Sequence, residues 1–164
     1  MQITNEENSK LLMEHLMEPK NYGKLEDNNA IGIGKNPQNG EKVVIYLKVK
    51  EDENGEPIIE DIKFQAIGCT TTVVAGSIIT TEAKGLSFSR ARDLISVTLG
   101  MLDGVDEADA ACTEMVALAL QASLDTYLER KKDKDFPIIS YRINTDCTPK
   151  EEKQKEENSS EKDI

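Results

Sequence analysis

Hydrophobic and polar residues alternate along two stretches in the first half of the chain, and this pattern predicts β-strands. Residues 42–50 read KVVIYLKVK and residues 58–67 read IIEDIKFQAI, with the dipeptide Asn54-Gly55 between them. Val, Ile, Tyr and Phe are enriched in strands, and Asn-Gly is a strong hairpin signal. The two stretches are therefore predicted to pair as an antiparallel hairpin, with one face that another element must cover.

Three later stretches repeat their apolar residues at the spacing of a helix. Residues 71–84 are apolar or small nearly all round and are followed by Gly85, which suits a helix packed deep against a sheet. Residues 88–99 come after Ser87, a good N-cap residue, and residues 112–131 form the longest periodic run. These three helices are predicted to cover the buried face of the hairpin.

The segments that flank this central part carry weaker patterns. Residues 8–17 have apolar side chains at helical spacing, which predicts a short amphipathic N-terminal helix. Residues 24–41 are rich in Gly and Asn and are predicted to form a loop with a tight turn at Asn39-Gly40. Residues 136–143 form a short apolar piece that we expect to pack as an extended segment.

The fold class predicted from these elements is α+β: a small antiparallel β-sheet with helices packed on one face. With 164 residues, of which 38% are hydrophobic, the chain can build one core of ordinary size. We expect a single domain over residues 1–147. Residues 148–164 are expected to be a disordered charged tail, because almost no apolar side chain there could offset the cost of ordering.

The charge of the chain limits its partners. The formal net charge is −11 at pH 7, and such a surface repels nucleic acid and anionic membranes. Residues 1–7 contain neither a basic segment nor an apolar run, and no later stretch is long and apolar enough to span a bilayer. We therefore expect a cytoplasmic protein that binds neither nucleic acid nor membrane.

Three cysteines are the main candidates for chemistry. Cys69, Cys112 and Cys147 are widely separated and form no CxxC pair, so we expect reduced thiols instead of a disulfide framework. Cys69 follows a predicted strand and Gly68, at the start of a predicted helix, where unpaired amides and the helix dipole stabilise a thiolate. The alternative is that Cys69 is a small buried hydrophobic residue at a strand–helix corner.

These residues could form one metal site. Cys69 and Cys112, each predicted near a helix start, could meet at one end of the sheet, and the loop with Asn39 and Glu41 could supply a third ligand. Thiolate and carboxylate ligands together suit zinc or ferrous iron. His15 is the only histidine; we interpret it as an ordinary helix-surface residue because no other ligand type lies beside it in the sequence.

Three motifs in the same order resemble those of the IscU/NifU-type iron–sulfur cluster assembly scaffolds. Residues 17–25 (MEPKNYGKL) are similar to the family's opening turn. Residues 35–41 (KNPQNGE) resemble its Gly-Asn-Pro-x-Cys-Gly-Asp signature, and residues 67–77 (IGCTTTVVAGS) resemble its Gly-Cys motif that opens a helix. The resemblance covers about residues 12–131 and identifies the 1–147 domain as a NifU-like scaffold domain.

The chain departs from the family's ligand set in three places. Asn39 stands where the family has its first cysteine, Glu41 stands where it has aspartate, and Ala111 precedes Cys112 where it has histidine. The resemblance implies a metal site made by Cys69, Cys112 and Glu41, with Asn39 beside them. The fourth ligand of a [2Fe–2S] cluster would have to come from a homodimer, a small thiol or Cys147.

The resemblance implies a scaffold without catalytic residues, whose cargo is iron or a [2Fe–2S] cluster, with zinc as another candidate ion. It also implies a cysteine desulfurase and recipient apoproteins as partners. The family's chaperone-recognition segment is absent and residues 104–109 stand in its place, so we do not expect an Hsp70-type chaperone to bind. The alternatives are a degenerate member that carries no cluster and acts as an interaction protein in the same pathway, or a zinc- or iron-binding regulatory module.

Overall fold

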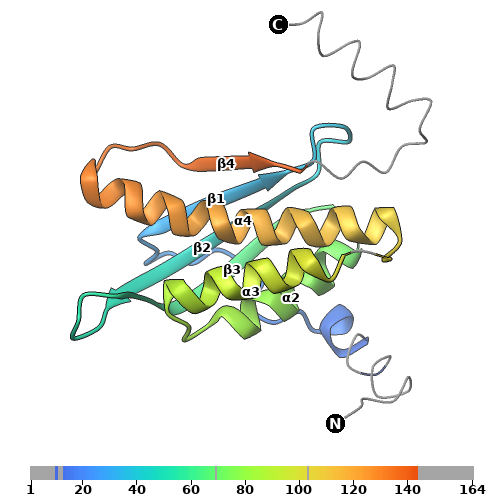
Figure 1. The fold of residues 1–164 in the computed structure, drawn as a ribbon. Coiled ribbons are helices and arrows are strands. Elements are labelled where there is room, and N and C mark those ends of the chain that lie inside the picture. Colours follow the sequence, from blue (N-terminus) through green and yellow to red (C-terminus); the bar gives the residue numbers. More distant parts are fainter. Residues whose placement is uncertain (1–9, 11–12, 69, 103, 144–164) are drawn as a thin grey trace, which may run out of the picture.

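The structure is a computed structural model, and it describes residues 10, 13–68, 70–102 and 104–143. In this part of the chain a four-stranded sheet lies beneath helices (Figure 1). The strands are β1 (Ala30–Lys35), β2 (Lys42–Glu51), β3 (Pro57–Ile67) and β4 (Ile139–Arg142). The helices named here are α2 (Thr70–Ala83), α3 (Phe88–Gly100) and α4 (Glu107–Lys132).

The sheet has the strand order β3-β2-β1-β4. The predicted hairpin is confirmed: β2 and β3 pair antiparallel, and Gly55 lies in their turn with φ +80°. β4 confirms the extended C-terminal segment but pairs parallel to β1, so the sheet is mixed where we expected only antiparallel pairs. The reason is that α4 carries the chain back along the sheet before β4 begins, so that β4 runs in the direction of β1 (Figure 1).

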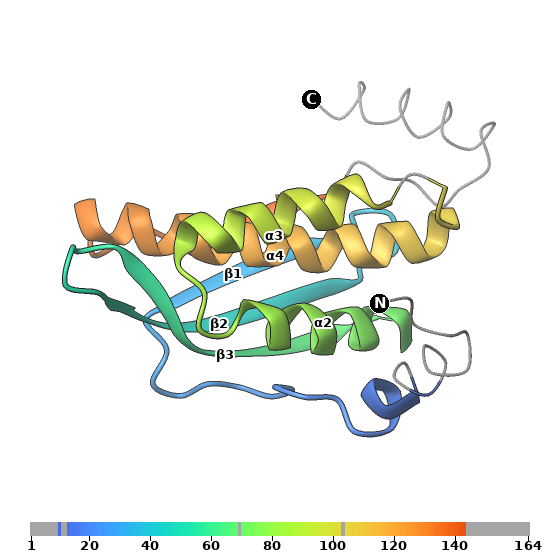
Figure 2. The same ribbon diagram turned by 60° about the horizontal axis from the view of Figure 1, so that its bottom comes forward.

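One face of the sheet is buried under the helices, as expected. Gly32, Ile45 and Phe64 are paired across β1, β2 and β3, so their side-chain positions lie on the same face. A Cβ atom added at Gly32 would meet the backbone of α4, and one added at Gly76 of α2 would meet the Phe64 ring. Both helices therefore cover this face, and α3 lies beside α4 (Figure 2). The α+β class and the one-sided helical layer are confirmed.

The prediction of a loop over residues 24–41 was wrong for the part that forms β1. Ala30, Gly32 and Gly34 are buried and alternate with the less buried Ile31 and Ile33, which is the period of a strand. Glycine is poor at forming strands, and this misled the sequence interpretation. Here the glycines are required, because α4 approaches β1 so closely that no side chain fits between them.

The longest helix begins earlier than predicted. We expected it to start at Cys112, but α4 begins at Glu107 after the N-cap residue Asp106. The first turn carries Glu107 and Asp109, whose negative charges suit the positive end of a helix dipole. Apolar periodicity was a poor guide here, because the residues that start this helix are acidic residues and alanines.

The segment after the predicted N-terminal helix runs along the outer edge of β3. Residues 13–17 form a short helical turn within the predicted stretch 8–17. Further on, Phe64 N–H donates to Asn21 O at 2.9 Å, and Gly23 N–H donates to Phe64 O at 2.8 Å. These two hydrogen bonds satisfy an edge that would otherwise be open at that position. The domain end at residue 147 and the tail 148–164 lie outside the described residues.

Candidate metal centre

The turn between β1 and β2 presents two of the expected site residues. Asn36 N–H donates to Glu41 O at 2.9 Å, and Gly40 N–H donates to Asn36 O at 3.1 Å. Gly40 has φ +76°, a left-handed conformation that favours glycine. This confirms the tight turn at Asn39-Gly40, and it holds Asn39 and Glu41 at one end of the sheet.

Asn39 and Glu41 are joined by a hydrogen bond within this turn. Glu41 N–H donates to the Asn39 side-chain oxygen, Oδ1, at 3.0 Å. Asn39 is exposed and Glu41 is half-buried. The side chain of Asn39 therefore closes a local turn over the Glu41 N–H.

The Glu41 carboxylate lies at the corner between β3 and α2. A Cβ atom built on Gly68 would be 3.4 Å from both Cδ and Oε2 of Glu41, and 3.2 Å from Thr72 Oγ1. The strand register explains this closeness, because Lys42 is paired with Ile67. Glu41 precedes Lys42 and Gly68 follows Ile67, so these two residues come next to each other beyond the last pair of the antiparallel ladder. A carboxylate thus lies where a side chain on Gly68, the residue that precedes Cys69 in the sequence, would touch it.

The starts of α2 and α4 are joined by a side-chain hydrogen bond. Thr71 Oγ1 donates to Asp109 Oδ1 at 3.0 Å, so the first turns of the two helices lie side by side. Sequence reasoning missed Asp109, which contributes a second carboxylate near this end of the sheet. Its position three residues before Cys112, on the same helix face, is the signal that could have found it.

Cys112 is buried, with 6% of its surface exposed, and it makes a contact within the chain. It follows Glu107, the first residue of α4, by five positions and so lies in the second turn. Cys112 was expected at or near the helix start, but it lies beyond the first turn, so the stabilisation expected for a thiolate at a helix start does not extend to it. The unpaired N–H groups and the dipole effect belong to the first turn.

Two of the expected site residues lie outside the described residues: Cys69 and Cys147. Among the residues that the structure describes, no group of three or more His, Cys, Asp or Glu side chains could hold a metal ion. Glu41 comes close to Gly68, and Thr71 bonds Asp109, but the meeting of Glu41, Cys69 and Cys112 at one point stays a prediction. A ligand set at this end would depend on Cys69.

His15 is buried, with 6% of its surface exposed, which corrects our expectation of a helix-surface residue. Its Nδ1 lies 2.6 Å from Ser77 Oγ, and the same oxygen accepts a hydrogen bond from Lys20 N–H at 2.8 Å. Ser77 belongs to α2, so the histidine attaches the N-terminal helical turn to the body of the domain. The role of His15 is therefore structural, and the contact with Ser77 is made by one of its two ring nitrogens, Nδ1.

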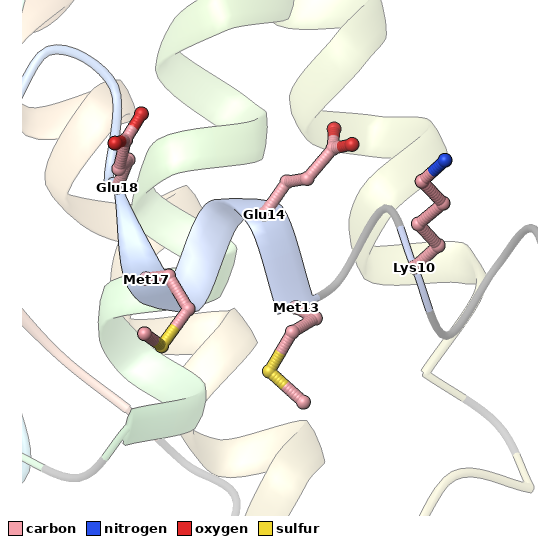
Figure 3. A pocket seen from close by; sticks show the side chains of 5 residues that line it. All are labelled: Lys10, Met13, Glu14, Met17 and Glu18. Carbon is pink, nitrogen blue, oxygen red and sulfur yellow. The ribbon is translucent and has the colours of Figure 1, made fainter.

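Two of the hollows in the described part of the chain lie away from the turn at residues 36–41. One, of about 480 Å³, is lined by Lys10, Met13, Glu14, Met17 and Glu18 of the N-terminal part, and the side chains of Met13 and Met17 extend to the same side of it (Figure 3). The other, of about 430 Å³, is an apolar groove between α2 and α3 that includes Val74, Ile78, Val97 and Met101. Neither groups carboxylates with a cysteine.

These observations define a small α+β domain that has a carboxylate beside the corner between a strand and a helix. A family model described as the NifU-like N terminal domain matches residues 7–134. This chain belongs to that family. In addition, among the described residues no helix combines the length and the apolar character needed to cross a membrane.

Named relatives cover most of the chain. It is similar to the iron-sulfur cluster assembly scaffold protein IscU 1 of Archaeoglobus fulgidus, with 33% identity over 123 residues, which are 73% of this chain and 75% of the relative. It is also similar to the zinc-dependent sulfurtransferase SufU of Bacillus subtilis, with 27% identity over 100 residues, 61% of this chain and 64% of that protein.

The fold also matches a solved structure. The N-terminal part of a nitrogen-fixing NifU-like protein from Brucella abortus superposes with a TM-score of 0.60, at 13% sequence identity. The match covers 74% of this chain and 94% of that one. At this identity the likeness concerns the fold, which is the α+β arrangement described above.

Proposed function

We propose that this chain is a scaffold for iron–sulfur cluster assembly, which holds iron or a [2Fe–2S] cluster as cargo and gives it to recipient proteins. The observation that carries the proposal is the position of the Glu41 carboxylate, whose Oε2 would lie 3.4 Å from a Cβ atom built on Gly68, the residue directly before Cys69. Membership of the NifU-like family and the likeness to a relative named as a scaffold support it. In this proposal Cys69 and Cys112 are thiolate ligands and Glu41 assists them.

The ligand set predicts a cluster that is held less tightly than one with three cysteines. An iron–sulfur cluster is normally bound by four thiolates, and the neutral amide of Asn39 is a poor substitute for an anionic sulfur. Ala111 also lacks the imidazole that could compensate. The fourth ligand would come from Cys147, a small thiol or a second copy of the chain.

A zinc-binding protein that transfers sulfur is the second candidate function. The likeness to the zinc-dependent sulfurtransferase SufU favours it, and two thiolates with one carboxylate form a ligand set that zinc accepts. In this case the protein would be an enzyme, contrary to the expectation of a scaffold without catalytic residues. The two candidates differ in one measurable property, because zinc gives no visible absorption and an iron–sulfur cluster does.

The partners and the compartment follow from the same proposal. A cysteine desulfurase would supply sulfur, and apoproteins would receive the cluster, in the cytoplasm. An Hsp70-type chaperone is not proposed, because residues 104–109 do not contain the expected recognition segment. If no cluster forms at all, the protein would be an interaction protein of this pathway.

The test is reconstitution of the full chain with iron and sulfide in the absence of oxygen, followed by visible spectroscopy. We expect absorption from a cluster in the wild type, a stronger and longer-lived absorption in Asn39→Cys, and none in Cys69→Ala. Asn54→Cys is the matched control, because it adds a thiol at the other exposed Asn-Gly turn. If Asn39→Cys changes nothing and Cys69→Ala keeps its metal, the scaffold function is refuted.

A further inference from the structure

The face of the sheet that turns away from the helices carries three positive charges in a row (Figure 1). Gly34 faces α4, so its neighbour Lys35 points to the opposite face. Lys35 is paired with Lys42 of β2 on one side and with Arg142 of β4 on the other. Neighbouring strands are about 4.8 Å apart, so these three residues, called the basic row below, share a strip about 10 Å wide.

The basic row is not neutralised within the described part of the chain. Its members form no ion pair with a residue that the structure describes. At the other end of the same face, Lys48 Nζ lies 3.1 Å from Asp27 Oδ2 and 3.9 Å from Glu60 Oε2. Asn29 N–H donates to Leu47 O at 2.8 Å, so the segment before β1 also lies at that end. The end beside the turn at residues 36–41 has no such partners.

The basic row costs stability and brings the fold no evident gain. Like charges directly opposite each other on neighbouring strands are destabilising. Lysine on an edge strand can prevent sheets from pairing, but Lys35 and Lys42 belong to the inner strands β1 and β2. The chain has a formal net charge of −11, so three cations side by side also run against its composition. A binding role accounts for such an arrangement.

Apolar side chains lie next to the basic row. Ile67 is paired with Lys42 and is 63% exposed. Ile33 and Val44, the next pair along the same face, are half-buried. The surface therefore suits a partner that presents carboxylates together with apolar side chains. A protein can do so, whereas nucleic acid is an extended polyanion that the net charge of this chain repels.

We propose that the basic row and the apolar residues beside it form the docking surface for an acidic segment of a partner protein. Carboxylates of this segment pair with the three cations, and its apolar side chains cover Ile33, Val44 and Ile67. Charge pairs at such an exposed surface speed association and are weakened by salt. The binding is therefore strongest at low ionic strength.

The position of this surface gives docking a purpose. β1 ends at Lys35 and β2 begins at Lys42, so the basic row lies directly beside the turn that holds Asn39 and Glu41. A partner docked there is next to the candidate metal centre. That the partner exchanges cargo at this centre rests on the proposed function, but the docking itself does not.

The first experiment uses a soluble peptide with four glutamates and two leucines as the probe. A matched control peptide has glutamine in place of each glutamate. Nuclear magnetic resonance follows the backbone amide signals of the full chain during titration. We expect the acidic peptide to shift the signals of residues 33–35, 42–44 and 140–142, less so as salt is added, and the control peptide to leave them unchanged. No shifts, or shifts confined to other elements, would overturn the proposal.

Two variants separate the basic row from the net charge of the chain. Lys42→Gln and Lys48→Gln each remove one positive charge from the same face of β2. We expect Lys42→Gln to weaken peptide binding about fivefold and Lys48→Gln by less than about twofold, because the Lys48 charge is already paired. Equal losses would contradict the proposal. So would a single-stranded DNA oligonucleotide that binds the wild type as tightly as the acidic peptide does.

Thermal unfolding of the same variants tests whether the basic row is structural. We expect Lys42→Gln to raise the midpoint of unfolding, because it removes a repulsion, and Lys48→Gln to lower it slightly, because it removes two ion pairs. A lower midpoint in Lys42→Gln would mean that Lys42 serves the fold, against the proposal.

Two other occupants would show themselves without the peptide. Shifts of the same amides when the chain alone is concentrated would identify a second copy, and shifts in Glu151→Gln would identify the chain's own tail; either result would overturn the proposal. Peptide binding without any cluster on reconstitution would refute the scaffold function alone. A cluster without peptide binding would refute this inference alone.

Discussion

Strand β1 and the turn at residues 36–41 follow each other in the sequence but differ in how tightly they are packed. β1 is pressed against α4, and the turn is open. A Cβ atom on Gly32 would lie 2.0 Å from Ser123 N, and one on Gly34 would lie 2.1 Å from Met115 O. At Gly40, in the turn, no atom lies within 4 Å of that position. Backbone contact along β1 thus leaves no room for a side chain, while two of the site residues, Asn39 and Glu41, lie in a turn that has such room.

This difference explains how the family's first cysteine can be replaced by Asn39. A side chain in an exposed turn is constrained by its chemistry more than by its volume, so ligand residues there can be exchanged without loss of the fold. At Gly32 even one methyl group is too many. We expect substitutions along β1 to change stability and substitutions in the turn to change metal binding.

Gly32→Ala is expected to give the largest loss of stability. The methyl group would meet the backbone of α4, which cannot move aside as a side chain can, so we expect a loss of about 3 kcal/mol or more in unfolding free energy. Urea unfolding measures it. Gly100→Ala is the control, because Gly100 ends α3 with no atom within 4 Å and should be neutral or slightly stabilising.

Gly76→Ala sharpens the comparison, because here a side chain opposes the new methyl group. The Cβ position lies 2.4 Å from the Phe64 ring, which is fully buried but can shift more than a helix backbone can. We expect a loss of about 1–3 kcal/mol in the same urea experiment. A loss larger than that of Gly32→Ala would contradict the special role of the β1–α4 contact.

Ser77→Ala tests the attachment of the N-terminal turn. It removes the oxygen that bonds both His15 Nδ1 and Lys20 N–H, so we expect a loss of about 1–2 kcal/mol. Ser89→Ala is the control, because its hydroxyl bonds only Glu56 at an exposed site. Equal effects of the two substitutions on thermal unfolding would show that the buried histidine contact contributes little.

The smallest expected effect is a change of stability with pH that depends on Tyr141 of β4, the strand paired with β1. Burial, and then the hydrogen bond to Asp125 at 2.5 Å, raise the pKa of Tyr141 from 10.0 to about 12. A raised pKa means that the folded state holds the proton of Tyr141 more tightly than the unfolded state does. The contribution of Tyr141 to the free energy of unfolding is therefore present below pH 10 and is lost between pH 10 and about 12.

Asp125→Asn is the variant for this test. It removes the carboxylate but not the burial, so the pKa of Tyr141 should fall part of the way towards its ordinary value. Ultraviolet absorption of tyrosinate during an alkaline titration measures this. An unchanged titration of Tyr141 would show that Asp125 has no influence on it.

The fold could be predicted from the sequence where side-chain period and turn residues agree. The hairpin β2–β3, its Asn54-Gly55 turn and helices α2 and α3 follow from such patterns. β1 was missed because its glycines have low strand propensity, and the reason for them is the backbone of a helix far along the chain. A requirement of that kind has no local signal.

The site could be predicted only as far as single residues. The turn at Asn39-Gly40 was predicted from its residue types, and Glu41 was predicted as a ligand because it follows that turn. The closeness of Glu41 to Gly68 depends instead on strand register. Asp109 was missed because its hydrogen bond to Thr71 joins the starts of two helices that are distant in the sequence. The predicted start of α4, and with it the position of Cys112 in the helix, was wrong because the first residues of α4 are acidic residues and alanines without an apolar period.

The proposed function requires that this chain holds an iron–sulfur cluster through Cys69 and Cys112, with Glu41 assisting. The most direct test is the iron, zinc and acid-labile sulfide content of the full chain purified without oxygen, beside Cys69→Ala prepared in the same way. We expect iron and sulfide together in the wild type and neither in the variant. Zinc without sulfide, or the same iron and sulfide in both proteins, would contradict it.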